Sequence, residues 1–304
     1  MEKFGLIGDP VARSMSPAFF EAGYNGRYSY DLIEGHDFNT SWARFLEEYK
    51  AINITAPFKE KAFAQAVALA KEGRGEISGP AWKIGAANIA VKCPGGGIAV
   101  HNSDFSAIIM CIAEGIFPGV VKQCYDVFGD RGHIKVHQFV RLNLEEHYGR
   151  RPQALVVGCG GAGKAAAVAC AEMGFSTVLM NRTEMKARAF ALEVPEYGFI
   201  VDPVQDFLGA MRECDVVVYT VPEKMEALSG AAEEDFRNED GKPKIILEAN
   251  YRTPSFSGET AQLAENAGCR YIGGRKWLLY QALSGYGTMT GETPCFEAMA
   301  SVME

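Results

Sequence analysis

The chain has 304 residues, of which 48% are hydrophobic, and a formal net charge of -8 at pH 7. That length exceeds what a single hydrophobic core usually serves, so we expect two domains. The acidic balance, without a basic stripe, argues against a nucleic-acid partner, and no apolar run is long enough to cross a membrane.

Eight cysteines are scattered along the chain without a Cys-x-x-Cys pair, and Cys159, Cys170 and Cys214 stand in apolar runs. This distribution indicates buried thiols in a reducing compartment, not a disulfide framework or a zinc site. The chain also opens directly into a predicted strand, with no signal-peptide pattern. We therefore expect a cytoplasmic α/β protein.

Strands and helices alternate over the first hundred residues, which is typical of a mixed or mostly parallel sheet. The first helix is expected to start at Ser16-Pro17, with the serine as N-cap, and to end at Asn25-Gly26. Pro57 ends the third strand. The predicted strands are 4–8, 28–33, 51–55, 87–91 and 98–101, and the predicted helices are 18–24, 41–49 and 60–72.

The stretch from Leu155 to Lys164 predicts a dinucleotide site. A short apolar strand stops at a glycine, more glycines follow, and an alanine-rich helix comes next. Glycine allows the backbone to approach a pyrophosphate closely, and free N–H groups at the helix start attract its negative charge. A strand–loop–helix–strand order is the context that this motif requires, so dinucleotide binding is favoured over a plain tight turn. The candidate residues are Gly158, Gly160, Gly161, Ala162 and Gly163.

The next predicted strand ends in Asn181-Arg182-Thr183. An NAD-specific protein usually has an acidic residue there, which accepts hydrogen bonds from the ribose 2′-hydroxyl. That acid is absent, and a guanidinium suits a 2′-phosphate in charge and in bidentate geometry. A surface arginine after a strand is the alternative, but the position relative to the glycine loop favours NADP over NAD.

The remaining elements outline the domains. Helices are predicted at 107–116 and 134–148, before a domain junction at 150–152. The dinucleotide unit continues through strands at 216–220 and 245–248 and helices at 204–213 and 259–266. The apolar helical segment from Trp277 is expected to pack back on the first domain. We assign residues 1–104 and 274–304 to a substrate-binding domain, 105–152 to an extended helical connection and 153–273 to the dinucleotide-binding domain.

Two ionisable residues follow strands of the first domain, at the kind of position where open α/β sheets carry active sites. They are Lys59 and Asp104. Each has a simpler interpretation: Lys59 as a solvated lysine in a first helical turn, and Asp104 as a helix N-cap. The simpler interpretation is stronger for Asp104 than for Lys59.

Nine short motifs follow one another along nearly the whole chain: Gly5-Leu-Ile-Gly-Asp-Pro10, Ser14-Met-Ser16-Pro17, Asn53-Ile-Thr-Ala-Pro-Phe-Lys59, Gly85-Ala-Ala-Asn88, Asn102-Ser-Asp104, Gly158-Cys-Gly-Gly-Ala-Gly163, Asn181-Arg-Thr183, Glu248-Ala-Asn-Tyr251 and Leu279-Tyr-Gln281-Ala282. In order and spacing they resemble the shikimate dehydrogenase family. The resemblance implies an N-terminal α/β substrate domain with a mostly parallel sheet, a Rossmann-type NADP-binding domain and a cleft between them.

The resemblance also implies residue roles. Lys59 would exchange the proton at the substrate oxygen that becomes a ketone, with Asp104 beside it. Ser14 and Ser16 would bind the substrate carboxylate. The reaction would be reversible hydride transfer between NADP and a cyclohexene or cyclohexane carboxylate such as shikimate or quinate, in chorismate and aromatic amino acid biosynthesis. Further substrate contacts would come from Thr55, Asn88, Asn102, Tyr251 and Gln281, and a further cofactor contact from Thr220.

Several positions depart from the family pattern. Arg13 stands where histidine is usual, and Ile89 follows Asn88 where threonine is usual. Lys276 and Trp277 replace a glycine–methionine pair that lines the nicotinamide site, and Lys224 stands where glycine is common. These changes motivate an alternative, a ligand-binding or regulatory homologue that binds the substrate but has lost hydride transfer.

The segment from Gly115 to Arg151 is longer than the family's usual connection, and we expect it to make a homodimer contact or to cover the cleft. His133 and His137 lie one helical turn apart within it, a spacing that is able to ligate zinc. Ile134 stands where the glutamate of His-Glu-x-x-His is required, so a solvated helix face is favoured over a metal site.

Overall fold

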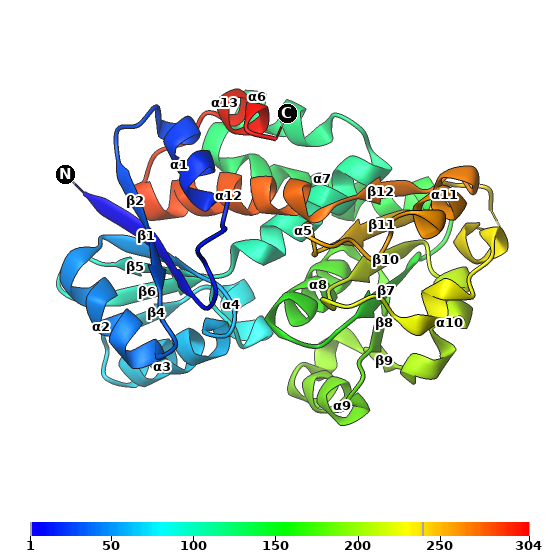
Figure 1. Ribbon diagram of the computed structural model, residues 1–304, viewed down its shortest axis with the longest axis horizontal. Helices are drawn as coiled ribbons and strands as arrows, with labels where there is room; N and C mark the ends of the chain where they lie inside the picture. Colours follow the sequence, from blue (N-terminus) through cyan, green and yellow to red (C-terminus); the bar gives the residue numbers. More distant parts are fainter. Residues whose placement is uncertain (1, 239, 304) are drawn as a thin grey trace. The chain divides into compact units, whose positions relative to one another are not determined.

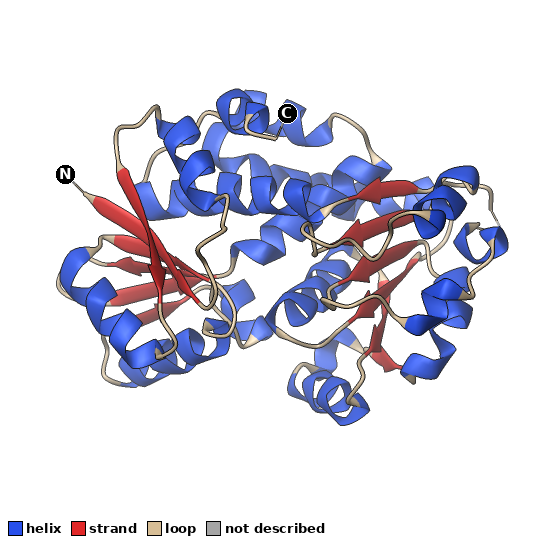
Figure 2. Cartoon of the chain, in the orientation of Figure 1, coloured by secondary structure: helices blue, strands red, loops and turns tan. Residues whose placement is uncertain are grey.

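The computed structural model describes residues 2–238 and 240–303, which divide into two compact units; Figure 1 labels their elements and Figure 2 separates helix from strand. The first unit combines the chain up to Ala107 with the chain from Leu279 onward, and the second comprises Ile108–Leu278. Within the described residues, no helix is long and apolar enough to span a membrane.

The first unit is built on a six-stranded sheet in the order β2-β1-β3-β5-β6-β4 (Figure 1). β1 pairs parallel with β2 and β3, and β4 pairs parallel with β6, whereas β5 runs antiparallel to β3 and β6. The central strand β3 is buried at every residue. The strands are β1 (Lys3–Gly8), β2 (Ser29–Glu34), β3 (Ala51–Ile54), β4 (Gly75–Ile77), β5 (Ile89–Lys92) and β6 (Ile98–His101).

The helices of the first unit are α1 (Ser16–Tyr24), α2 (Phe38–Glu48), α3 (Lys59–Lys71), α4 (Gly79–Ile84) and α13 (Phe296–Ser301), together with the start of α5 (Ser103–Ile116) and most of α12 (Gly274–Thr290). Aromatic side chains dominate the core. Trp42, Phe45 and Phe58 bury one part of it, and Phe20 packs against Tyr30 and Tyr286, with ring centroids 4.7 Å apart in each case. The prediction that the last long helix packs on the first domain is therefore confirmed.

The starts of α1 and α2 differ from the sequence prediction for reasons that the capping bonds show. Ser16 is the first residue of α1 and not its cap, because Met15 occupies the N-cap position without a side-chain capping bond. The hydroxyl of Ser14 instead accepts the backbone N–H of Ser16 at 3.2 Å. α2 begins earlier than predicted because the carboxylate of Asp37 caps it, accepting the N–H of Thr40 at 2.7 Å.

The second unit contains a six-stranded sheet in the order β12-β11-β10-β7-β8-β9, in which every pairing is parallel. The chain leaves β7 toward β8 on one side and reaches β10 on the other, so the strand order reverses at β7, where open α/β sheets bind ligands. The strands are β7 (Gln153–Val157), β8 (Ser176–Met180), β9 (Ile200–Val201), β10 (Val216–Tyr219), β11 (Ile245–Glu248) and β12 (Arg270–Ile272), and the connecting helices are α8 (Gly161–Met173), α9 (Glu184–Glu193), α10 (Phe207–Glu213) and α11 (Glu259–Asn266).

The helical segment before β7 clusters with the second unit. It consists of the rest of α5, then α6 (Val120–Phe128) and α7 (Gly132–Tyr148). Gly132 allows a close turn between α6 and α7, since a Cβ there would lie 2.5 Å from the ring of Tyr125. Beyond α7, the guanidinium of Arg150 donates two hydrogen bonds, at 2.7 and 2.8 Å, to the buried carboxylate of Asp215.

His133 and His137 are half-buried, so the predicted solvated helix face is wrong for these two side chains. Nε2 of His137 lies 3.1 Å from the backbone oxygen of Glu172 on α8, and burial lowers the pKa of His133. Within the described part of the chain, no group of three or more His, Cys, Asp or Glu side chains is arranged to hold a metal ion.

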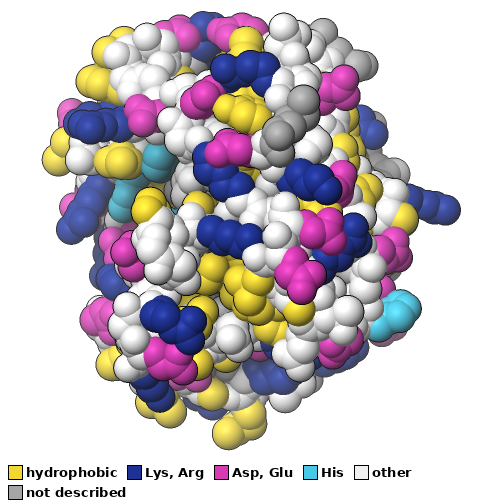
Figure 3. Space-filling model, turned by 90° about the vertical axis from the view of Figure 1, so that its left-hand side faces the viewer, with side chains coloured by type: hydrophobic (Ala, Val, Ile, Leu, Met, Phe, Trp, Pro, Cys, Tyr) yellow, Lys and Arg dark blue, Asp and Glu magenta, His cyan; other side chains and the backbone are white. Residues whose placement is uncertain are grey.

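The eight cysteines form no disulfide, and Cys159, Cys170 and Cys214 are buried, as predicted. Cys295 is exposed, so the prediction of a buried thiol is wrong at that position. Figure 3 presents one face of the molecule, on which basic and acidic side chains are interspersed instead of being gathered by sign.

Candidate active site

Lys59 and Asp104 form a largely buried charge pair in the first unit. Lys59 is the first residue of α3 and Asp104 the second residue of α5. Nζ of Lys59 lies 2.5 Å from Oδ2 of Asp104, and only 15% and 4% of the two side chains are exposed. The interpretation of Lys59 as a solvated lysine is therefore wrong.

Asp104 is not the N-cap that the simpler interpretation required. Asn102 has that role, because its Oδ1 accepts the backbone N–H of Phe105 at 3.3 Å while its Nδ2 donates to the backbone oxygen of Ala86 at 2.9 Å. The Asp104 carboxylate is thus left to Lys59 and to the site around it.

Asn88, immediately before β5 (Ile89–Lys92), holds the same helix start. Its Oδ1 accepts the backbone N–H of Ser103 at 2.7 Å, and its Nδ2 donates to the Ser103 hydroxyl at 3.2 Å. Asn88 is fully buried and Asn102 nearly so. Both amides therefore use much of their hydrogen-bonding capacity to fix the turn that carries Asp104.

The predicted carboxylate-binding serines lie where β1 leads into α1. The Ser14 hydroxyl donates to the Ser16 hydroxyl at 3.0 Å, and the two side chains form one polar group at the start of the helix. Thr55 is half-buried after β3, and Gln281 is half-buried on α12. Both belong to the first unit, as Lys59 does, whereas Tyr251 belongs to the second unit.

Asn53 is a polar residue that the sequence reasoning quoted in a motif but did not assign to the site. It lies on β3 with 9% of its surface exposed, and its Oδ1 accepts the hydroxyl of Tyr30 at 2.8 Å. An amide on an otherwise apolar, fully buried strand is the signal that could have identified it.

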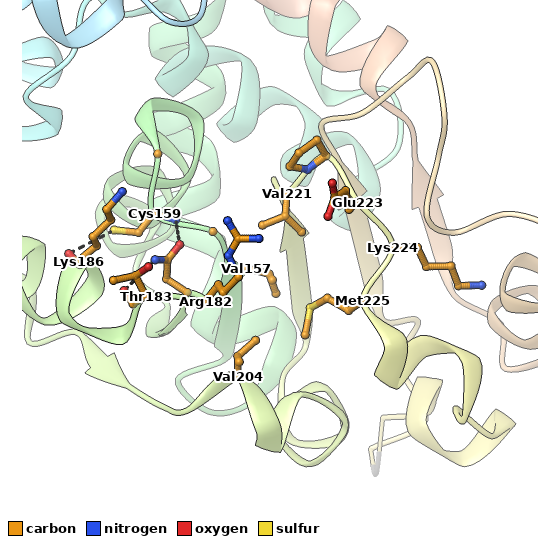
Figure 4. A pocket seen from close by; sticks show the side chains of 14 residues that line it. Val157, Cys159, Arg182, Thr183, Lys186, Val204, Val221, Glu223, Lys224 and Met225 are labelled. Carbon is orange, nitrogen blue, oxygen red and sulfur yellow. Dashed lines mark hydrogen bonds between the residues drawn. The ribbon is translucent and has the colours of Figure 1, made fainter.

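A pocket of about 380 Å³ opens beside the glycine loop of the second unit (Figure 4). Gly158 has φ of 105°, and a Cβ at Gly163 would lie 2.0 Å from the Gly158 oxygen, so both positions need glycine. The pocket is lined by five of the residues that the sequence assigned to the cofactor, namely Gly158, Gly160, Asn181, Arg182 and Thr183.

Four other predicted cofactor residues stand behind this lining. Gly161, Ala162 and Gly163 form the first turn of α8, and their early N–H groups have no partner within a helix. The Thr220 hydroxyl donates to the backbone oxygen of Val157 at 2.8 Å and packs close to Gly158. These four residues shape the glycine loop, but they are not among the residues that line the pocket.

Asn181 braces the pocket internally. Its Oδ1 accepts the backbone N–H of Cys159 at 3.0 Å, and its Nδ2 donates to the backbone oxygen of Thr183 at 2.8 Å. The glycine loop and the end of β8 are thereby tied together. Arg182 is exposed and its guanidinium points into the space between the walls in Figure 4.

Lys186 is a second cation in the pocket lining that the sequence reasoning missed. It stands in the first turn of α9, close in sequence to Arg182. Lys224 also lines the pocket, but its ammonium donates to the Thr260 hydroxyl at 2.7 Å and points away from Arg182 in Figure 4. Trp277, one of the departures from the family pattern, is buried, with 4% of its surface exposed.

The chain matches two family models. Residues 6–90 match the shikimate dehydrogenase substrate binding domain, and residues 143–248 match the shikimate/quinate 5-dehydrogenase model. The NADP(+) shikimate dehydrogenase of Haloarcula marismortui is 30% identical over 299 residues, which cover 96% of this chain and 94% of that protein. The enzyme of the same name from Archaeoglobus fulgidus is 27% identical, with 95% and 93% covered.

Solved structures show the same fold. Shikimate 5-dehydrogenase from Thermus thermophilus, solved with NADP(H) and shikimate, superposes with a TM-score of 0.72 at 24% identity and covers 99% of this chain and 98% of its own. Quinate dehydrogenase from Corynebacterium glutamicum, solved with NAD, gives a TM-score of 0.72 at 22% identity with the same coverage.

Proposed function

The chain belongs to the shikimate dehydrogenase family, and from that premise we propose that it is an NADP-dependent oxidoreductase that reversibly reduces 3-dehydroshikimate to shikimate, or a close ring hydroxy-carboxylate such as quinate. The observation that carries the proposal is the buried pair of Lys59 and Asp104. The activity belongs to chorismate and aromatic amino acid biosynthesis.

We assign the proton transfer to Lys59. NADP, when bound, supplies or accepts the hydride, and the substrate oxygen must gain or lose a proton in the same reaction. The Lys59 ammonium is the available donor to that oxygen, and the neutral amine is the acceptor in the reverse direction. Asp104 orients the ammonium through the 2.5 Å contact.

The substrate ring is held by groups of the first unit. Ser14 and Ser16 donate hydrogen bonds to the carboxylate, and Thr55, Gln281 and Asn53 face the ring hydroxyls. Asn88 and Asn102 support the site by holding the start of α5, and their direct contact with the ring, like that of Tyr251, stays a prediction from the family resemblance.

The cofactor is assigned to the pocket of the second unit. The first turn of α8 offers free N–H groups and the positive end of the helix to the pyrophosphate. Arg182 and Lys186 supply two positive charges to a 2′-phosphate. An NAD site would instead need an acidic residue to accept hydrogen bonds from the ribose 2′-hydroxyl, and neither of these two side chains is able to do so. NADP is therefore preferred to NAD. On this basis the first unit is the substrate-binding domain and the second the dinucleotide-binding domain.

A second candidate function is a ligand-binding or regulatory homologue without hydride transfer. It is favoured by Lys276 and Trp277, which replace a glycine–methionine pair of the family.

A homodimer through α6 and α7 is also proposed, because Val127 and Leu142 expose 71% and 81% of their surface there. The free thiols support a cytoplasmic location.

The decisive experiment follows nicotinamide absorbance with shikimate and with quinate, each offered with NADP and with NAD. Turnover with shikimate and NADP is the expected result. Binding of either ring acid by calorimetry without any turnover would favour the regulatory homologue, and the absence of both binding and turnover would overturn the assignment of the site.

A further inference from the structure

Two buried phenols of the first unit meet beside the proposed substrate residues. Tyr30 of β2 donates its hydroxyl to Oδ1 of Asn53 at 2.8 Å. Tyr286 of α12 donates its hydroxyl to the backbone oxygen of Ser16 at 2.9 Å. The rings of Tyr30 and Tyr286 lie near each other, so the Asn53 and Ser16 contacts belong to one cluster. We call these four residues the phenol cluster.

The phenol cluster is held rigidly by its aromatic rings. Phe20 packs at 4.7 Å from both Tyr30 and Tyr286, whose own ring centroids are 6.0 Å apart. Burial raises the pKa of Tyr30 well above its ordinary value. The Tyr30 phenol is protonated at neutral pH, as tyrosines ordinarily are, and the packed rings leave its oxygen little freedom to move.

This fixed donor determines which way the Asn53 amide faces. The two ends of an asparagine amide have nearly the same shape, but the oxygen accepts hydrogen bonds and the nitrogen donates two. Because Tyr30 donates to Oδ1, the NH₂ group is turned to the other side. There, among the residues that the structure describes, Nδ2 donates only to the backbone oxygen of Asn88, at 3.5 Å, which is at the limit of a hydrogen bond.

We propose that Tyr30 is a positioning residue for substrate recognition, which fixes the Asn53 amide so that its N–H groups are offered to an oxygen of the bound ring next to the Ser14–Ser16 pair. The inference rests on the proposed function, because it takes a hydroxylated ring carboxylate as the ligand. Tyr30 acts through Asn53. The Lys59 chemistry does not depend on it.

The first test replaces Tyr30 by phenylalanine, which keeps the ring and removes the hydroxyl. The Asn53 amide then loses its fixed donor, so KM for shikimate should rise roughly 3- to 10-fold, as for the loss of one neutral hydrogen bond. kcat should stay within about twofold, because Lys59 is untouched. Tyr28→Phe is the matched control: the Tyr28 phenol donates to Glu292 at 2.9 Å on the surface, and its removal should leave KM and kcat unchanged.

A double-mutant cycle separates positioning from a general structural effect. If Tyr30 acts through Asn53, then Tyr30→Phe should change KM little once Asn53→Ala is present, whereas a structural defect would add to it. Asn53→Asp is a second variant that keeps an acceptor for Tyr30 but has no N–H to donate, so it should also weaken shikimate binding. If Tyr30→Phe does not fold, Asn53→Asp still tests whether the N–H groups of Asn53 bind shikimate.

An unchanged KM in Tyr30→Phe, additive losses in the cycle, or full shikimate affinity in Asn53→Asp would each overturn the positioning role. Failure of the proposed function has a different signature, since wild-type protein would then show no turnover. In that case the same variants are compared by calorimetry with shikimate, where the predicted losses of affinity still apply, and the absence of any wild-type binding would overturn both assignments.

Discussion

At position 59, a lysine with 15% of its side chain exposed contacts a carboxylate that is almost completely enclosed. If Lys59 transfers the proton, Lys59→Ala should lower turnover by about 10²–10⁴-fold, the range for a positioned acid–base group. Shikimate affinity should fall less, because the serines and Gln281 remain. Steady-state kinetics and calorimetry measure the two effects.

The control for this variant is Lys71→Ala, at the exposed last turn of the same helix, which should leave kcat unchanged. Circular dichroism should show both variants folded. A Lys59→Ala protein that loses affinity and keeps its turnover at saturation would mean that Lys59 only contacts a bound hydroxyl.

Arg182 gives a prediction for cofactor choice. Arg182→Ala removes a charge-assisted contact to a 2′-phosphate, so NADP binding should weaken by about 1.5–3 kcal/mol, roughly tenfold to a hundredfold, and NAD binding much less. Fluorescence titration with each cofactor measures this. Arg188→Ala, an exposed arginine that pairs with Glu184, is the control. Equal losses for both cofactors would show that Arg182 does not read the phosphate.

The sequence identified the site residues that stand in linear motifs. It did not identify the residues that the fold brings to the site from distant parts of the chain. Lys59, Asp104 and Arg182 follow strand ends, where position alone suggests a role. Tyr30 and Tyr286 are separated by most of the chain, so only the fold brings them together beside Ser16. The assignment of Ser16 as a cap failed because local propensity does not distinguish the N-cap from the first helical residue.

At the scale of elements, Lys244 closes the end of α10. Its buried ammonium donates to the backbone oxygens of Met211 at 2.7 Å and Arg212 at 3.3 Å, and also to that of Cys214. Lys244→Met should leave these carbonyls without a donor and lower the free energy of unfolding by about 1–3 kcal/mol.

Denaturant unfolding tests this role, with Lys242→Met as the control. Lys242 pairs with Asp240 near the surface, and its loss should cost no more than about 0.5 kcal/mol. Equal stability of Lys244→Met and wild type would show that water or backbone adjustment satisfies the freed carbonyls.

Element prediction succeeded where apolar periodicity was long or the ends were marked. β11 and α11 have the predicted bounds, and α7 ends before Gly149, as predicted. Gly149 itself has the left-handed conformation. β4, β9 and α4 were not predicted, because two to six residues are too few to show a period. α6 was missed because Pro118-Gly119 indicated only a break.

For the whole molecule, three histidines predict how stability depends on pH. Burial lowers the pKa of His101, His133 and His147 below the ordinary 6.5. As pH falls through that ordinary value, the unfolded chain binds protons that the folded chain does not, so stability is lost. The midpoint temperature of thermal unfolding should therefore decrease as the pH is lowered from about 7.5 to about 5.5.

The pKa of His36 is shifted in the opposite direction, so this histidine serves as an internal comparison. The carboxylate of Asp9 raises its pKa, and the side chain is exposed. NMR titration should place His36 above 6.5 and the three others below it. His101→Gln should flatten the fall in thermal midpoint, and a fall as steep as that of wild type would exclude His101 as a contributor.

The order in which the two units are encoded bears on how the protein is made. The second unit is one uninterrupted stretch, Ile108–Leu278, whereas the first needs residues from both ends of the chain. On the ribosome, the second unit is complete while the first still lacks most of α12 and all of α13, and with them the phenol that meets Ser16. Its aromatic side chains, Phe20 among them, then have to wait for the last residues to emerge, so nascent chains are most prone to aggregate in that interval.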